Sequence, residues 1–287
     1  MKLTAFRANN PVAMMAAYGV LRLLPGARLR WDGPCPELEW DGDVIDFLAG
    51  RLQERLRAPE ATLIDDPRAI DGADSYRQLA CQMPSEWLVA YAAETAEGLR
   101  PTGLRLLGGR HQFIANAREI MAALLKEDVR LKLQEGLLGP WRYEDKGLQA
   151  WGWDAAARID AAASAKAVTS APKSGVLSAY WLAWESLPFW PMVNGRTVGM
   201  GRHHWSYPTS AEWIGAHELG ALILGAEGLH ERETKALGVT RWRAERIGSS
   251  DYGGVLGWAR PVLARTSSEH ENMGRFARTE RRKGSIP

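Results

Sequence analysis

The sequence contains only two cysteines among its 287 residues. Cys35 and Cys81 are far apart and lack the paired CxxC spacing that a four-thiolate zinc site requires. Two isolated thiols also do not supply the framework of bridges that stabilises small secreted proteins. The cysteine content therefore favours a reducing compartment, and we expect a cytoplasmic protein.

Long apolar runs are also lacking. No stretch of about 18 apolar residues, the length that indicates a membrane-spanning helix, occurs in the sequence. The first residues, MKLTAFRANNP, lack the charged region, the apolar run and the small-residue cleavage site of a signal peptide. We therefore expect a protein that is neither secreted nor membrane-spanning.

Charge of one sign does not dominate the chain. The 36 basic and 34 acidic residues leave a formal net charge of +2, so attraction for nucleic acid must come from local patches. Between Asp41 and Arg100 there are 12 acidic and 6 basic side chains, whereas between Arg241 and Pro287 there are 10 basic and 5 acidic. The C-terminal stretch is therefore the better candidate for contacting phosphate.

The motifs of several enzyme classes are missing. His217 and Glu218 begin a metalloprotease HExxH pattern, but Ala221 replaces the second histidine. No GxSxG elbow occurs, and the glycine pair at 108–109 lacks the lysine and hydroxyl of a P-loop. We therefore predict a protein with no catalytic site, metal or cofactor. A hydrolase remains an alternative without a predicted shared site, and its candidate residues are Glu185, His203 and His217.

The sequence has ample material for a core, with 46% hydrophobic residues and thirteen tryptophans. We expect most of the indole rings in the core and some on a contact surface. Near the N-terminus we predict a strand at 3–6 and a helix that Asn10 caps and Pro11 begins. Strands at 29–31 and 37–40 follow around a Gly-Pro turn. This order predicts an α+β fold.

The middle of the chain has helical periodicity, and its C-terminal part mixes helix with antiparallel strands. The expected elements are helices at 44–56, 85–96, 114–133 and 176–187, a hairpin within 193–205, a helix begun by Ser210 that extends to 224, and a strand at 238–247. Small and polar residues between 155 and 175 predict a flexible loop or linker. The predicted organisation is an N-terminal α+β region 1–154, the linker 155–175, a C-terminal α+β region 176–265 and a basic polar tail 266–287.

A glycine-hinged polar loop is the first candidate for binding. Gly108 and Gly109 allow a ligand to approach the backbone closely. The three residues that follow, Arg110, His111 and Gln112, offer hydrogen-bond donors of the kind that read base edges. The alternative is a plain turn before the next helix, which would have the same composition.

Two further clusters are polar and basic. The predicted hairpin carries Asn194, Arg196, Arg202, His203 and His204. Such a hairpin can follow a phosphate backbone, but a solvated hairpin has the same composition, and adjacent histidines on a strand point to opposite faces and do not share a metal. Basic charge beside an aromatic ring is typical of nucleic-acid contact, although a charge run is usually a solvated face. The cluster with basic charge beside an aromatic ring consists of Arg241, Trp242 and Arg243, with Arg275, Arg278, Arg281, Arg282 and Lys283 in the tail.

Three segments, taken in order, resemble one known family. Asn10 and Pro11 precede the run AYGVLRL at 17–23, LLGGR lies at 106–110, and Trp151 to Asp154 precede YWLAWESLPFWP at 180–191. These look like the alanine-rich N-terminal helix, the glycine-pair loop and a later apolar element of the large subunits of type I CRISPR surveillance complexes. The similarity is to the subtype I-U branch, also called I-G, of these Cascade assemblies.

The resemblance implies a non-catalytic subunit that recognises a protospacer-adjacent motif in duplex DNA and promotes R-loop formation. It implies that Asn9, Asn10, Arg110, His111 and Gln112 probe the motif. Arg196, Arg202 and the basic tail would then hold the backbone or the displaced strand. The implied partners are backbone subunits that carry CRISPR RNA (crRNA), the target double-stranded DNA and a recruited helicase-nuclease. Because the sequence shows no C-terminal four-helix bundle, a separate small subunit is expected as well.

The main rival to this hypothesis is a structural protein. In that case Trp-rich surfaces would bind other proteins of an assembly, and the basic tail would be incidental. RNA that copurifies with the protein would favour the surveillance function, whereas an RNA-free protein partner would favour the scaffold.

Overall fold

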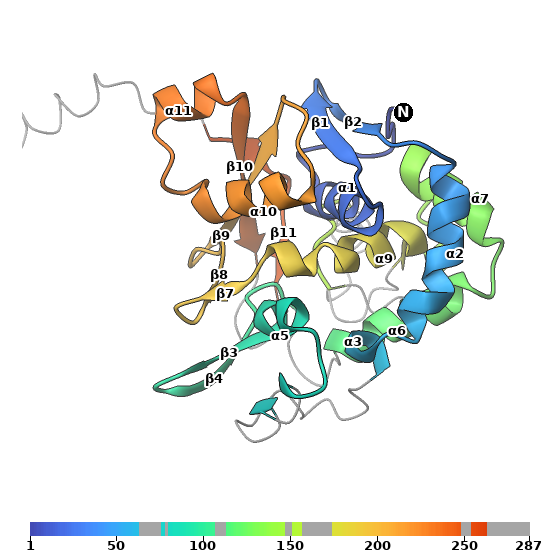
Figure 1. Cartoon of the computed structure of the whole chain (residues 1–287), viewed down its shortest axis with the longest axis horizontal. Coiled ribbons are helices and arrows are strands. Elements are labelled where there is room, and N and C mark those ends of the chain that lie inside the picture. The colour runs from blue at the N-terminus through green and yellow to red at the C-terminus, as the bar shows by residue number, and fades with distance from the viewer. Residues whose placement is uncertain are drawn as a thin grey trace, which may run out of the picture.

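The structure is a computed structural model, and it describes residues 1–62, 76–77, 80–106, 113–146, 151–156, 174–247 and 254–262. It contains helices and antiparallel strands, which confirms the predicted α+β class (Figure 1). None of the helices within these ranges is long and apolar enough to cross a membrane. The predicted loop 155–175 falls largely outside the described residues, and so does the tail.

The first half of the chain carries most of the helices. Its elements are α1 (Pro11–Leu23), β1 (Arg28–Asp32), β2 (Cys35–Glu39), α2 (Val44–Leu56), α3 (Pro59–Thr62), α5 (Ser85–Tyr91), β3 (Ala92–Thr95), β4 (Gly98–Pro101), α6 (Phe113–Leu124), α7 (Val129–Leu138) and β5 (Asp145–Lys146). The second half contains β6 (Ser174–Gly175), α9 (Leu177–Glu185), a 3-10 helix (Leu187–Phe189), β7 (Met192–Val193), β8 (Arg196–Thr197), β9 (His204–Ser210), α10 (Ala216–Gly225), α11 (Glu231–Ala236), β10 (Val239–Ile247), β11 (Val255–Leu256) and β12 (Arg260–Pro261).

Helices α1 and α9 pack against each other at the centre of the molecule (Figure 1). Every residue of α9 is buried, and Arg22 is the one residue of α1 that is not. Gly19 makes the close approach possible, because a Cβ at this position would lie 1.7 Å from the carbonyl oxygen of Leu182. The two helices therefore meet backbone to backbone, and the regions before and after the predicted linker share one hydrophobic core.

Aromatic rings fill much of this core. Eight of the thirteen tryptophans are buried, which confirms that most of them belong to the interior. Trp151 and Trp153 stack with their ring centroids 4.6 Å apart, and each donates its indole N–H to a backbone carbonyl, of Phe113 and Leu104 respectively. These hydrogen bonds remove the cost of burying the indole N–H groups.

One carboxylate is buried among the rings. Glu185, at the end of α9, has a side chain with 0% exposure and accepts from Arg55 Nε at 2.9 Å and Arg22 Nη1 at 3.1 Å. Trp181 Nε1 donates to the same carboxylate at 3.1 Å. Both guanidinium groups also lie over the ring of Trp87, with Arg22 at 4.9 Å and Arg55 at 5.4 Å from the ring centroid. Removing one partner of such a buried pair typically costs about 3–5 kcal/mol, so this cluster fixes α1, α2 and α9 relative to one another.

The C-terminal sheet lies beside the helical core. Strand β10 is its centre, pairing antiparallel with β9 from Val239↔Ser210 to Glu245↔His204 and, on its other edge, with β11 and β12. Tyr207 donates its hydroxyl to the carbonyl of Ala8, and Tyr18 in α1 donates to the carbonyl of Pro208. These two bonds hold one face of the sheet against α1.

Two expected elements near the N-terminus differ in the structure. The strand predicted at 3–6 is wrong, because only Lys2 bridges to Glu37 and the chain then turns toward α1. The helix predicted at 85–96 ends at Tyr91, and its last residues form β3 instead. The turn at Gly98, where φ is +114°, brings β4 back along β3, an arrangement that helical periodicity does not reveal.

Two other helices have different limits. The helix predicted at 114–133 is two helices, because Asp128 accepts from the N–H of Leu131 and begins α7. The helix predicted from Ser210 starts later, since Ser210 is the last residue of β9. The carboxylate of Glu218 accepts from the N–H of Gly215 and supplies the N-terminal cap of α10.

The close approach of α1 to α9 gives a first prediction. We expect Gly19→Ala to lower the free energy of unfolding by at least about 2 kcal/mol, because the added methyl group collides with backbone that cannot move aside. The matched control is Gly50→Ala in α2, where nothing lies within 4 Å of the new Cβ. We expect this control to gain up to about 1 kcal/mol. Urea denaturation measures both, and similar values for the two variants would contradict the packing.

Candidate nucleic-acid interface

The outer face of the C-terminal sheet carries a row of arginines. Side chains alternate along β10, so Arg241 and Arg243 lie on the face opposite the buried Ala244. Arg260 of β12 is the direct partner of Arg243 in the antiparallel register, and it lies on the same face. The sheet thus holds three arginines close together on its outer side.

This arrangement is unfavourable for the isolated protein. Directly paired residues in an antiparallel sheet have Cβ atoms about 4.5–5.5 Å apart, and like charges at such positions repel each other. Within the described part of the chain, Arg241, Arg243 and Arg260 form neither an ion pair nor a side-chain hydrogen bond. An anion bound between them would relieve the repulsion, and planar guanidinium groups match phosphate oxygens well.

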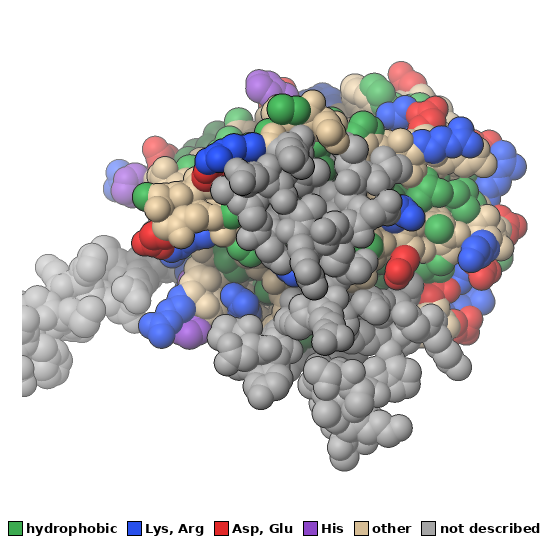
Figure 2. Space-filling model, turned by 90° about the horizontal axis from the view of Figure 1, so that it is seen from below, with side chains coloured by type: hydrophobic (Ala, Val, Ile, Leu, Met, Phe, Trp, Pro, Cys, Tyr) green, Lys and Arg blue, Asp and Glu red, His purple; other side chains and the backbone are tan. Residues whose placement is uncertain are grey.

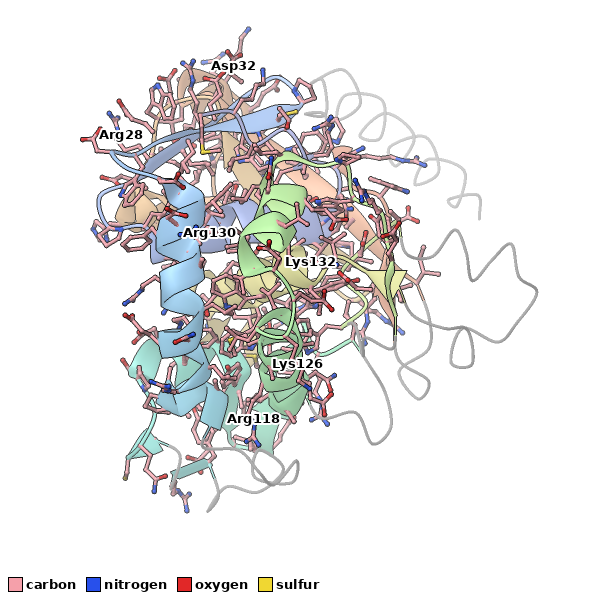
Figure 3. All side chains as sticks on the ribbon, turned by 90° about the vertical axis from the view of Figure 1, so that its right-hand side faces the viewer. Arg28, Asp32, Arg118, Lys126, Arg130 and Lys132 are labelled. Carbon is pink, nitrogen blue, oxygen red and sulfur yellow. The ribbon has the colours of Figure 1, made fainter. Side chains whose placement is uncertain are left out.

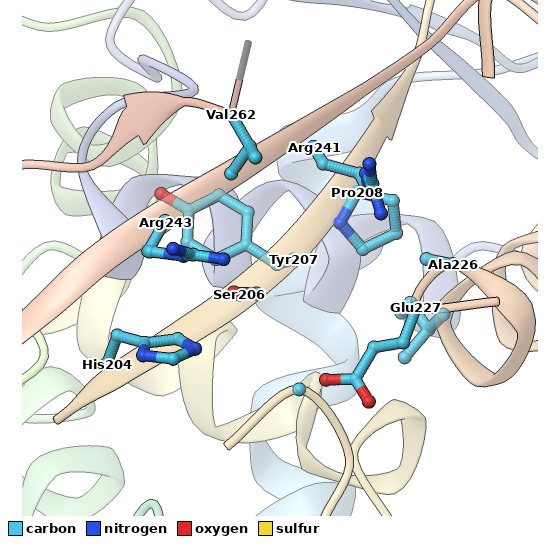
Figure 4. Close-up of a pocket in the computed structure, with 11 residues that line it drawn as sticks. His204, Ser206, Tyr207, Pro208, Ala226, Glu227, Arg241, Arg243 and Val262 are labelled. Atoms are coloured by element: carbon cyan, nitrogen blue, oxygen red, sulfur yellow. The ribbon is translucent and has the colours of Figure 1, made fainter. Parts of the chain in front are cut away.

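A cavity of about 230 Å³ lies next to this row, between the sheet and the end of α10. Figure 4 shows His204 and Arg243 on one side of the cavity and the carboxylate of Glu227 on the other. The remaining residues that line it are Gly199, Ser206, Tyr207, Pro208, Ile223, Ala226, Arg241 and Val262. Three predicted binding residues, His204, Arg241 and Arg243, therefore meet at one concave surface.

His204 is neutral more often than an ordinary histidine. Burial lowers its pKa, and the positive charge of Arg243 lowers this pKa further. Glu227 opposes these effects, and His203 adds to them. A phosphate beside His204 would favour the imidazolium form, since an opposite charge nearby stabilises a cation.

Sequence reasoning missed Arg260, which pairs with Arg243 on this surface. It also missed Trp258, two residues earlier in the chain, which is 44% exposed. Exposed aromatic rings among arginines are typical of surfaces on which bases stack. The run Trp258-Ala259-Arg260 has the same aromatic-and-basic pattern as 241–243, and that pattern was the available signal.

The hairpin residues are divided between several places. Asn194 and Gly195 form the turn between β7 and β8 with positive φ values of 51° and 72°, so Asn194 has a conformational role as well as an exposed side chain. Arg196 and Arg202 line a second cavity and not the arginine row. His203 is exposed and lies next to His204 at the start of β9.

The two asparagines before α1 have different environments. Asn9 is exposed, and its carbonyl accepts from the N–H of Ala259, which places it next to the strand that ends in Arg260. Asn10 is only 4% exposed, and its amide donates to Asp154 at 2.9 Å while its oxygen accepts from the N–H of Ala155. The expected side-chain cap is wrong, because Asn10 makes no such bond. The burial of Asn10 and its two internal hydrogen bonds argue against a role in probing DNA.

The glycine-hinged loop, with Gly108, Gly109, Arg110, His111 and Gln112, lies outside the described residues. The structure does describe residues on either side of this loop. The carbonyl of Leu106 accepts from the N–H of Gly254, and α6 begins at Phe113. The segment 254–259 therefore contacts both Leu106, two residues before Gly108, and Asn9.

A second basic surface, on α6 and α7, is already neutralised in part (Figure 3). Arg130 pairs with Asp46 at 2.9 Å, and Lys132 pairs with Asp145 at 2.5 Å. Side chains of both charges are interspersed on this side of the molecule, at the right in Figure 2. This surface offers an external anion less unpaired positive charge than the sheet does.

The candidate hydrolase residues do not come together. Glu185 is enclosed with its two arginines, and His217 is exposed on α10 beside the capping residue Glu218. No group of three or more metal-ligating side chains occurs within the described ranges. Among the candidate sites, the arginine row with its adjacent cavity is therefore the best defined.

Comparison with known proteins adds no constraint on this surface, since no protein-family model and no curated protein matches the chain.

The environment of His204 predicts a pH dependence of anion binding. The pKa of His204 in the free protein lies below its ordinary value of about 6.5, and a bound phosphate raises it. Affinity for duplex DNA should therefore rise as pH falls from 7.5 towards 5.5. Fluorescence anisotropy at fixed salt measures this effect. We expect His204→Gln to reduce the rise and His217→Gln, on α10, to leave it unchanged; equal pH profiles for all three proteins would rule out His204.

Proposed function

We propose that this protein binds nucleic acid through the outer face of its C-terminal sheet, as the large subunit of a type I CRISPR surveillance complex. The observation that carries the binding proposal is the direct pairing of Arg243 with Arg260 beside Arg241, without a carboxylate partner among the described residues. The motif resemblance supplies the more specific identity. In this assignment the protein recognises the protospacer-adjacent motif and promotes R-loop formation, and it cuts no DNA.

The amount of charge fits a searching complex. Each arginine that neutralises a phosphate releases condensed counterions, and a few such contacts give a weak grip that depends on salt. A nearly neutral protein with one local basic row avoids being held at the many nonspecific sites of a genome. The net charge of +2 agrees with this requirement, and so do the sheet arginines, which form no ion pair with any residue that the structure describes.

The flanks of the predicted motif-reading loop support a common surface. Leu106, two residues before Gly108, and Asn9 both bond to the segment 254–259, which leads into Arg260. We assign Arg110, His111 and Gln112, together with Asn9, to reading the motif. The arginine row would hold the phosphates of the same duplex. Base pairing with the guide would then read the remaining sequence.

The proposed assembly has four other components. They are the backbone subunits that carry crRNA, the target double-stranded DNA, a separate small subunit and a recruited helicase-nuclease. A scaffold with Trp-rich surfaces is less well supported, because eight of the thirteen tryptophans are buried and only Trp258 is largely exposed.

The duplex-binding proposal predicts a change in salt dependence. We expect the triple variant Arg241→Gln, Arg243→Gln, Arg260→Gln to weaken binding to duplex DNA. The slope of log affinity against log salt should fall by roughly 2 to 3, because each lost phosphate contact removes about 0.9. Anisotropy titrations between about 50 and 200 mM NaCl measure the slope.

The matched control removes the same charge from arginines that are already ion-paired on the surface. Arg28→Gln, Arg51→Gln and Arg130→Gln break pairs with Glu39, Glu54 and Asp46. We expect this control to change the slope by less than about 1. If the two triple variants lose the same slope, binding follows net charge and not the sheet.

The identity of the assembly predicts bound RNA. Coexpression with the products of the neighbouring genes should give a complex with a raised ratio of absorbance at 260 and 280 nm, which falls after ribonuclease treatment. The guide RNA of a surveillance complex causes this signal. An RNA-free complex with a protein partner would instead support the scaffold, even if the isolated chain binds duplex DNA.

A further inference from the structure

A second cavity, of about 540 Å³, lies between the β3–β4 hairpin and the β7–β8 hairpin. This volume is within the range of roughly 300–1,000 Å³ that small-molecule sites occupy. Four arginines line the cavity, two from the hairpins, one from the following turn and one from β10: Arg100, Arg196, Arg202 and Arg246. The Arg246 side chain belongs to the opposite face of β10 from Arg243, because the two are three residues apart on a strand.

The charge of this cavity selects an anion. Arg100 pairs with Glu97, whereas Arg196, Arg202 and Arg246 form no ion pair with any other residue that the structure describes. Arginines that line one space, with no carboxylate among its described lining residues, favour phosphate over a neutral ligand. The positive charge of the cavity is therefore available to an external group.

The cavity also has an apolar part. Met192 and Met200 both line it, and thioether groups pack favourably against flat aromatic rings. A free inorganic anion would leave this part unused. A ligand that is anionic at one end and has a flat ring at the other matches both parts, and a nucleotide has this chemistry.

The walls are held in position before any ligand binds. Thr197 is buried, and its Oγ1 accepts from the N–H of Gly103 at 2.7 Å and bonds to Thr102 at 3.0 Å. A side chain at Gly103 would displace Met200, because an added Cβ would lie 2.8 Å from Met200 Cγ. The N–H of Gly201 donates to the carbonyl of His204, and this tight turn presents Arg202 at its tip. Such preorganisation lowers the cost of binding.

We propose that this cavity binds one nucleoside 5′-phosphate, with its phosphate on the arginines and its base against Met192 and Met200. The nucleotide is either free in solution or one unit of a single strand, and the chemistry recognised is the same. This inference goes beyond the duplex-binding function and does not depend on it, because the cavity and the arginine row use different side chains.

Isothermal titration of the full chain with AMP, adenosine and inorganic phosphate tests the cavity. We expect AMP to bind at least about tenfold more tightly than either of the other two, because only AMP uses both parts of the site. A 5′-phosphorylated tetranucleotide identifies the source: tighter binding than AMP assigns the site to a strand, and weaker binding assigns it to a free nucleotide. Equal affinity for AMP and inorganic phosphate would overturn the proposal.

Variants locate the binding within the cavity. Arg196→Gln and Arg202→Gln should each weaken AMP binding about tenfold, as expected for the loss of a charge-assisted contact. Met200→Ala should weaken AMP binding while leaving that of phosphate the same. Arg51→Gln, in the exposed pair with Glu54, is the charge-matched control, and equal losses in it and in the cavity variants would overturn the site.

Duplex binding measured on the same samples separates the two proposals. If the wild-type protein binds duplex DNA but not AMP, the cavity proposal alone is overturned. AMP binding by a protein that does not bind duplex DNA would support the cavity and overturn the proposed function.

Discussion

The contact between α1 and α9 is the central packing interaction of the residues that the structure describes. Gly19 allows the backbones to touch, and both helices are so fully buried that their surroundings must be built around them. Tyr18, one residue from the crossing, bonds to Pro208 in β9. The sheet is thereby fixed with its inner face on α1, and its alternating side chains must direct Arg241 and Arg243 outward. The geometry of the proposed binding surface therefore originates in a glycine contact in the core.

Arginines have two opposite roles in this chain, and the buried carboxylate of Glu185 shows the first of them. Its carboxylate pairs with Arg22 and Arg55 inside the protein, and both guanidinium groups lie over the ring of Trp87. Burying these charges is costly, so the cluster contributes a fixed geometry more than net stability. The arginines of the sheet have no such partner among the described residues, and their repulsion is left for a ligand to relieve. The contrast is one of environment, because the side chains are chemically identical.

Local signals made the larger elements predictable. Pro11 and apolar spacing indicated α1, the Gly33 turn indicated β1 and β2, and alternation indicated β10. Pairing between distant segments was not predictable, because residue 243 meets residue 260 only through a register that the chain acquires on folding. The same limit explains Asn10. Its sequence context is that of a helix cap, but Asp154 competes for its side chain from 144 residues away. Trp258 and Arg260 were overlooked although they repeat the aromatic-and-basic pattern of 241–243.

The near-neutral composition can support nucleic-acid binding because some basic residues are ion-paired with carboxylates and others are not. Arg130 and Lys132 on α7 are balanced by carboxylates, so they contribute little to the field that an approaching phosphate meets. On the outer face of β10, Arg241 and Arg243 form no ion pair with the described residues, and the same holds for Arg246 on the other face. One strand thus presents arginines on both faces that have no ion-pair partner in the described part of the chain, while the whole chain has a net charge of only +2. Where the acids lie, and not how many bases there are, determines which surface an anion selects.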